Sequence, residues 1–171
     1  MLPSSSTYAG WLALIRLYTG FFWIMHGLGK IRNPQWAVPG GDCAALIGQM
    51  SQHTGGPYHD FITNIVMPNV TVFAQLVAWG ETLVGVSLLL GLLTRLGGLV
   101  GVVLALNYWA AKGDYAHLSG YTTYDIAAAV LSFISLALPT GKTIGLDGLM
   151  GRRPRIDRVR QEPALAGTAP P

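Results

Sequence analysis

Three ionisable side chains lie within or at the edge of long apolar segments: Arg16, Glu81 and Asp125. A charge at the centre of a membrane helix costs about 2.5–3.5 kcal/mol, so such residues by default face a helix bundle or a wet cavity. Glu81 is too far from either end of its segment for its carboxylate to reach water. Two interpretations of Glu81 are open. It is either a proton acceptor beside a quinone or substrate pocket, or a structural acceptor that holds two helices together.

Arg16 is the nearest cation to Glu81 by topology, and we predict that the two residues form a functionally coupled, inward-facing pair. A direct contact requires Arg16 to point toward the middle of the bilayer, against the usual tilt of side chains toward the helix N-terminus. A water or a quinone headgroup between them is the alternative. Arg16 is also close enough to the end of its segment to extend toward the headgroups. Asp125 has a structural explanation as well, because Thr122 and Asp125 have the spacing of a capping box.

Other side chains are candidate contacts for a bound quinone. We predict His26, Lys30, Trp23 and Asp125 in this role, with Glu81 and Arg16 as catalytic residues. Weaker alternatives are a bis-histidine haem on His26 and His117, or a metal held with His53 and His59; no regular ligand spacing supports a metal site. The only cysteine, Cys43, excludes an intrachain disulfide and a Cys-based zinc site. Any redox chemistry therefore needs a partner or a bound carrier.

The elements that position these residues are membrane helices. The 171-residue chain is 51% hydrophobic and only 11% charged, which is about half the usual charged share. A bilayer core takes roughly 20 apolar residues as helix. Four segments fit that length approximately, and they predict an all-α, four-helix transmembrane bundle with spans over residues 10–28, 70–93, 96–111 and 122–138.

The segments outside the spans set the topology. Residues 1–141 carry five basic and five acidic side chains, whereas residues 142–171 carry six and three. The positive-inside rule then places both termini in the cytoplasm of a multi-pass protein of the plasma (inner) membrane. We expect 151–171 to be a flexible basic Pro/Ala-rich tail whose arginines, from Arg152 to Arg160, meet anionic lipid or an acidic partner.

A long outer loop, residues 31–67, carries apolar residues at helical spacing. We predict one or two short helices on the outer membrane face, the first capped by Asp42 and the second following Pro57. Trp36 and Tyr58 are expected at headgroup level.

Helical-wheel positions predict which faces pack. Arg16, Gly20, Trp23, Gly27 and Lys30 share one face of the first span. On the second span the shared face carries Ala74, Ala78, Glu81, Gly85, Leu92 and Arg95. Small residues beside the charges favour close packing of these two faces.

Several short motifs, in this order, resemble those of the DoxX/DoxD-like membrane proteins. The first span contributes Arg16-x-x-x-Gly20 and His26-Gly27-x-x-Lys30, and the second Glu81-x-x-x-Gly85 followed by Gly91-Leu92-x-Thr94-Arg95. The fourth span is followed by Pro139-Thr-Gly141-Lys-Thr-Ile-Gly-Leu146-Asp147. The resemblance covers about residues 8–150 and omits the outer loop and the tail.

The resemblance implies a four-span bundle in membrane redox work, in the DoxD-like branch as the small subunit of a thiosulfate:quinone oxidoreductase. The leading hypothesis is a membrane subunit of a quinone-linked oxidoreductase complex, with the oxidation of sulfur compounds as its candidate reaction. The alternative is a non-catalytic accessory subunit that stabilises a respiratory or other electron-transfer complex. In both cases the expected partners are protein subunits and membrane lipid, with no nucleic acid. Whether the chain is itself catalytic is left open.

Overall fold

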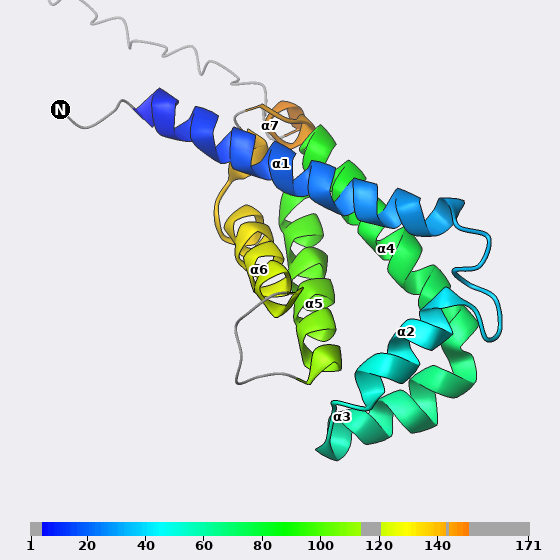
Figure 1. Ribbon diagram of the computed structural model, residues 1–171. Helices are drawn as coiled ribbons and strands as arrows, with labels where there is room; N and C mark the ends of the chain where they lie inside the picture. Colours follow the sequence, from blue (N-terminus) through cyan, green and yellow to red (C-terminus); the bar gives the residue numbers. More distant parts are fainter. Residues whose placement is uncertain (1–4, 114–120, 143, 151–171) are drawn as a thin grey trace, which may run out of the picture.

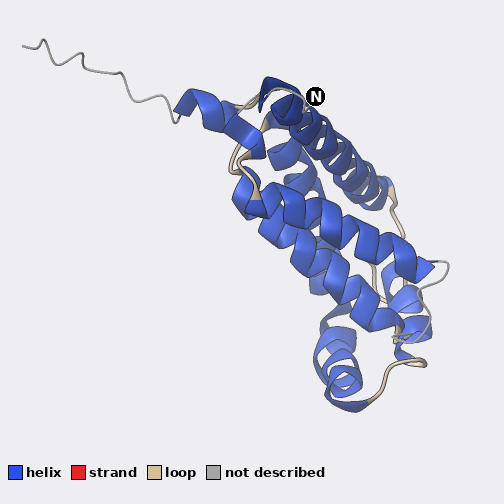
Figure 2. Ribbon diagram, turned by 90° about the vertical axis from the view of Figure 1, so that its left-hand side faces the viewer, coloured by secondary structure: helices blue, strands red, loops and turns tan. Residues whose placement is uncertain are grey.

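The computed structural model describes residues 5–113, 121–142 and 144–150. Within these residues every regular element is helical, and no strand occurs (Figure 2). The all-helical class is therefore confirmed. The elements, in chain order, are α1 (Ser5–Arg32), α2 (Asp42–Ser51), α3 (Gly56–Phe61), η1 (Ile62–Val66), η2 (Met67–Asn69), α4 (Val70–Leu90), α5 (Thr94–Lys112), α6 (Tyr121–Ala137), η3 (Thr140–Lys142) and α7 (Leu146–Met150).

Two helical stretches of the described chain are long and apolar enough to cross a membrane: Tyr8–Arg32 and Gly56–Leu90. Thr123–Ala137 is apolar but shorter. Each of the four predicted apolar segments coincides with one of the long helices α1, α4, α5 and α6. Gly91 ends α4 in the left-handed conformation, at φ 66°, which favours glycine.

The long helices pack as two antiparallel pairs, α1 with α4 and α5 with α6, joined by contacts of α4 with α5 and α1 with α6 (Figure 1). The predicted packing of the first two spans is confirmed. A Cβ atom at Gly20 would collide with the backbone of Leu89, and one at Gly85 with the backbone of Ile24. The absence of these side chains lets α1 and α4 approach almost backbone to backbone.

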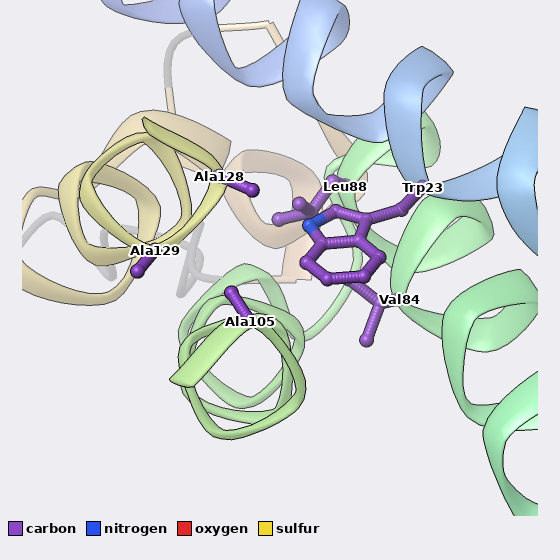
Figure 3. Close-up of a cluster of buried hydrophobic side chains, with 6 residues drawn as sticks. All are labelled: Trp23, Val84, Leu88, Ala105, Ala128 and Ala129. Carbon is purple, nitrogen blue, oxygen red and sulfur yellow. The ribbon is translucent and has the colours of Figure 1, made fainter. Parts of the chain in front are cut away.

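Trp23 lies between the long helices, in a cluster of buried hydrophobic side chains (Figure 3). Its side chain is 2% exposed and packs in a cluster with Val84, Leu88, Ala105, Ala128 and Ala129. Its indole nitrogen donates a hydrogen bond of 3.0 Å to Ser132 Oγ on α6. The aromatic ring therefore joins α1 to the three other long helices.

The segment between α1 and α4 differs from the prediction in two ways. The second loop helix is not separate from the span: helix continues from Gly56 to Leu90 through the π turn η1 and the 3₁₀ turn η2, with a change of direction visible in Figure 1. Pro68 does not end the helix, because it lies in the 3₁₀ turn, where one altered hydrogen bond bends the chain instead. Asp42 is the first helical residue and not the N-cap, which is Gly41; the Asp42 carboxylate instead accepts a bond of 2.7 Å from the Asn33 amide.

The α2–α3 arm (residues 42–61) also lies closer to the bundle than expected. α2 contacts both α4 and α5. Trp36 is buried, and its indole nitrogen donates to the Ala74 carbonyl at 3.0 Å. The indole is therefore covered by protein and finds its acceptor on α4. Its position at headgroup level stays a prediction. The side chain of Thr122, His117 and the Arg152–Arg160 cluster lie outside the described residues.

Candidate functional site

The buried carboxylate of Glu81 is bonded to two other helices. Lys30 of α1 places Nζ 2.5 Å from Oε1 and 2.6 Å from Oε2. Tyr108 of α5 donates its hydroxyl to Oε1 at 2.6 Å, and Lys30 Nζ donates to the same hydroxyl at 3.0 Å. Glu81 is 1% exposed and the Lys30 side chain 15%. We refer to these three residues as the Glu81 network.

Helix direction explains why Lys30 and Glu81 meet. Side chains lean toward the N-terminus of their own helix. Because α1 and α4 are antiparallel, Lys30 leans from the C-terminal end of α1 back into the bundle, and Glu81 leans toward the beginning of α4. The two side chains therefore converge. Bringing a charge into a low-dielectric interior is costly unless a partner compensates it, and Lys30 supplies the opposite charge.

An apolar cavity of about 280 Å³ lies beside the network, between the α2–α3 arm and helices α4 and α5. Tyr108 forms part of its wall, together with Trp36, Cys43 and Asn107; most other lining side chains are aliphatic or aromatic. Tyr58 donates to Asn107 Oδ1 at 2.8 Å, and the Asn107 amide nitrogen has no hydrogen-bond partner among the described residues. The cavity thus offers an apolar volume with a few polar groups at one wall.

A second cavity of about 310 Å³ lies on the other side of Trp36. Lys30 lines it, with Asn33 and Gln75. Lys30 Nζ is 5.2 Å from the ring centroids of both Trp36 and Tyr108, within the range of cation–π attraction. The Glu81 network therefore connects the wall of one cavity to the wall of the other.

Arg16 lies in a separate group of motif residues, about 21 Å from Lys30 along α1 at 1.5 Å per residue. Its guanidinium donates to the carbonyls of Thr140, at 3.2 Å, and Ile144. The close approach of the backbone depends on Gly91 and Gly145, where a Cβ atom would collide with Arg16 Nη1.

Asp147 completes this group, which we call the Arg16 cluster: Arg16, Gly91, Thr94, Thr140, Gly145 and Asp147. The Asp147 carboxylate accepts from the backbone of Leu93 at 2.8 Å and from the backbone and hydroxyl of Thr94 at 3.0 and 2.7 Å. Burial raises the pKa of Asp147, but the bonds from Thr94 and Leu93 and the charge of Arg16 lower it, and the net pKa is below the ordinary value. The cluster fastens the turn between α4 and α5 to the segment after α6.

A direct contact between Arg16 and Glu81 is not formed, because each residue has other partners. Both side chains are buried, as the inward-facing prediction requires, and their functional coupling stays a prediction. The usual tilt of side chains toward the helix N-terminus leads away from Glu81, and the Arg16 guanidinium binds the carbonyls of Thr140 and Ile144 instead. Glu81 takes Lys30 as its cation. Lys30 was predicted near the same site, and the structure places it in direct contact with the carboxylate.

The other predicted contacts are dispersed. His26 is exposed and packs on Phe22, with ring centroids 4.4 Å apart. Trp23 is a core residue. Asp125 accepts a bond of 2.6 Å from Lys112, which links α6 to the end of α5. Among the described residues, no three metal-binding side chains come together.

Sequence reasoning missed Tyr108 and the role of Trp36. Tyr108 follows a run of apolar residues in the third span, and a phenol at that depth was a signal for a buried hydrogen-bond partner. Cys43 lines the apolar cavity beneath α2, where burial raises the pKa of its thiol although the charge of Lys30 opposes the shift. A thiol in this position is a small buried side chain of low reactivity.

These features define an all-helical membrane protein with a buried charge network. The family model of DoxX matches residues 11–112, more than half of the chain, and the protein belongs to the DoxX family, a family of membrane proteins. The matched range contains the complete Glu81 network and Arg16. No curated protein and no solved structure matches the chain in the comparisons made.

Proposed function

We propose that the protein is the membrane subunit of a quinone-linked oxidoreductase complex of the DoxD-like type, with sulfur-compound oxidation as the candidate reaction, and that it binds quinone in the apolar cavity beside Tyr108. The observation that carries the proposal is the position of the Glu81 network between two cavities. One cavity is apolar and offers the Tyr108 hydroxyl; the other is lined by Lys30 and polar residues. Such an arrangement suits proton exchange between a membrane-soluble carrier and water.

The residues present fit a quinone headgroup. An apolar cavity with few polar groups is the usual form of a small-molecule site. The Asn107 amide nitrogen is the donor available to a quinone carbonyl oxygen, and the Tyr108 hydroxyl becomes a second one when it turns away from Glu81 Oε1, to which it now donates. A bound quinone supplies the two-electron chemistry, taking two electrons from a partner subunit and two protons as it becomes the quinol. The α2–α3 arm covers the cavity and limits the access of water.

The role of the network in this proposal is to hold and pass protons. Tyr108 shares its proton with Glu81 Oε1, and Lys30 donates to both carboxylate oxygens. In this path Tyr108 turns its hydroxyl from Glu81 into the cavity and gives up its proton; Glu81 then takes a proton from Lys30 and passes it to the Tyr108 oxygen. Lys30, which lines the second cavity, connects Glu81 to the polar side. His26, Trp23, Asp125 and Arg16 have no part in this path; each supports the helices that hold it.

The same proposal includes the topology: α1, α4, α5 and α6 are four spans, and both termini are cytoplasmic. Arg95 and Lys142 share the end of the bundle that holds the Arg16 cluster, whereas Lys30, Arg32 and Lys112 lie toward the opposite end. The excess of basic residues that the positive-inside rule requires on the cytoplasmic side comes from the five arginines of residues 152–160. The two cavities then lie toward the outer half of the membrane, where an extracytoplasmic partner has access to the arm.

Binding of a short-chain quinone to the purified protein tests the proposal directly. We expect decylubiquinone or a decyl-naphthoquinone to quench tryptophan fluorescence saturably, since Trp36 borders the cavity. Tyr108→Phe should weaken binding. Tyr18→Phe is the matched control, because Tyr18 is exposed on the outer surface of α1. Absence of saturable binding by the wild-type protein contradicts the proposal.

Turnover tests the proton role. In a complex recovered with its partners after mild detergent extraction, Glu81→Gln should preserve assembly and lower quinone-linked turnover by about 10²- to 10⁴-fold, the loss typical of a removed acid or base. Full activity of this variant in an assembled complex would remove the catalytic assignment.

A second candidate function, that of a non-catalytic accessory subunit, is favoured by one observation. The hydrogen bonds of Glu81 are all made within the chain, and they fasten α1, α4 and α5 together. A purely structural role predicts a different pattern: Glu81→Gln is nearly silent, whereas Glu81→Leu lowers the amount of assembled complex.

A further inference from the structure

A third cavity lies at the opposite end of the bundle from the Glu81 network. It measures about 470 Å³ and is bounded by α1, the end of α4, Lys142 and residues 144–149. Figure 1 shows α7 beside α1 at the C-terminal end of α4. Two cations line this cavity, Arg16 and Lys142, and the remaining walls are leucine, isoleucine and glycine. This cavity has no role in the proposed quinone reaction.

The positive charge of Arg16 is not neutralised by an ion pair in the described part of the chain. The guanidinium bonds two backbone carbonyls, and its Nε atom is buried without a hydrogen-bond partner among the described residues. Arg16 itself is 1% exposed. The nearby carboxylate, Asp147, is engaged by Leu93 and Thr94. A buried cation without a paired carboxylate favours an anion near this wall, because the anion compensates its charge.

The apolar surface next to the cavity has the character of a lipid contact. Leu90 and Leu149 line the cavity and are largely exposed, as is the adjacent Met150. Lys142 is exposed beside them, where its ammonium can reach a phosphate while its stem covers apolar surface. Basic pockets between membrane helices, at the level of the headgroups, are typical sites for anionic phospholipids.

We propose that this cavity binds one anionic phospholipid, with the phosphate at Lys142 in the field of Arg16 and an acyl chain along Leu90 and Leu149. Lys142 makes the direct contact. Arg16 acts through its charge, because its guanidinium is covered by the carbonyls of Thr140 and Ile144. Lipid binding here requires that the protein lies in a membrane, but it does not depend on the quinone reaction. The lipid site and the quinone function are therefore tested independently.

The lipid that the purified protein retains tests whether this cavity binds an anionic phospholipid. The full chain is reconstituted in nanodiscs of equal parts phosphatidylglycerol and phosphatidylcholine with identical acyl chains, extracted in mild detergent, and the retained lipid is identified by native mass spectrometry. We expect one phosphatidylglycerol to be retained in preference to phosphatidylcholine. Lys142→Gln should lower this preference about fivefold, since a lysine near anionic lipid contributes on the order of 1 kcal/mol.

Arg95→Gln is the matched control. It removes the same charge at the same end of the bundle, but Arg95 is exposed and does not line this cavity. The preference should be unchanged in this variant, and Leu149→Glu, which brings a carboxylate to the cavity wall, should abolish it. Equal losses in Lys142→Gln and Arg95→Gln would show attraction by net charge alone and overturn the site, as would equal retention of the two lipids by the wild-type protein.

Glycerol 3-phosphate distinguishes a lipid from a free phosphate ester. The proposed occupant is held by its acyl chain as well as its phosphate, so millimolar glycerol 3-phosphate should leave the retained lipid in place. Displacement of the lipid at that concentration would identify the site as one for small phosphate esters and contradict the proposal. Melting temperatures of the variants, measured in the same detergent, show that each protein compared is folded.

Discussion

Lys30 and Glu81, 51 positions apart in sequence, are joined across α1 and α4 by contacts of 2.5 and 2.6 Å. Removal of one partner leaves the other charge buried and unpaired, which typically costs about 3–5 kcal/mol. We expect Lys30→Met and Glu81→Leu each to lower the melting temperature sharply in detergent. A triple variant that also carries Tyr108→Phe contains no polar group of the network and should be more stable than either single variant.

The control for that series is Lys112→Met. The partner that this change leaves behind, Asp125, is 13% exposed, against 1% for Glu81, so Lys112→Met should lower the melting temperature less than Lys30→Met. A triple variant as unstable as the sum of its single changes would show that the three residues do not act as a unit.

Gly91→Ala tests the packing of the Arg16 cluster. Gly91 has φ 66°, and a Cβ atom there would meet Arg16 Nη1 and the Cα of Gly145. An alanine in the left-handed region costs roughly 1 kcal/mol, and the collision adds to this. Gly48→Ala is the comparison, because Gly48 lies inside α2 with open space around it and its substitution should stabilise by about 0.5–1 kcal/mol. Equal effects of the two changes on the melting temperature would contradict the described cluster.

The hydrogen bonds of the Asp147 carboxylate predict that the folded protein becomes less stable as the pH falls. The folded-state pKa of Asp147 is below its ordinary value, so the carboxylate stabilises the fold above about pH 4, the usual unfolded-state pKa. That contribution is lost as the pH falls through the lower folded-state pKa. Thermal unfolding of the wild-type protein between about pH 3 and pH 6 should therefore show a loss of stability at low pH that is reduced in Asp147→Asn. Identical pH profiles would mean that the bonds to Leu93 and Thr94 do not favour the charged form.

Cysteine accessibility tests the proposed topology. Cys43 is unsuited as a reporter, because it is buried and burial raises the pKa of its thiol. In a Cys43→Ala background, a cysteine at the exposed position of Gln52 should react in intact cells with an impermeant maleimide, whereas one at Arg95 should react only after the membrane is opened. The reverse pattern would invert the orientation.

The sequence was sufficient to predict the four long helices and the packing of α1 on α4, because apolar length and small residues carry those signals. The 35-residue helical stretch through Pro68 could not be predicted, since proline at the start of an apolar run has the pattern of a helix N-terminus. Side-chain direction decided the partner of Glu81. Because side chains lean toward the N-terminus of their own helix, a contact between Glu81 and Arg16 was disfavoured. The same rule predicts a contact between Glu81 and Lys30. The contact of Tyr108 with Glu81 could not be predicted, because it depends on how α5 lies against α4 in three dimensions.

The close approach of α1 and α4 at Gly20 and Gly85 leaves no compressible layer of side chains between the two backbones. The spacing of these helices is therefore fixed by main-chain atoms and does not adapt to the length of the groups on either side. Glu81→Asp, which keeps the charge but shortens the side chain by one methylene, cannot be accommodated by an inward movement of α1. The substitutions that position 81 tolerates are consequently limited by the fixed distance between α1 and α4 as much as by charge.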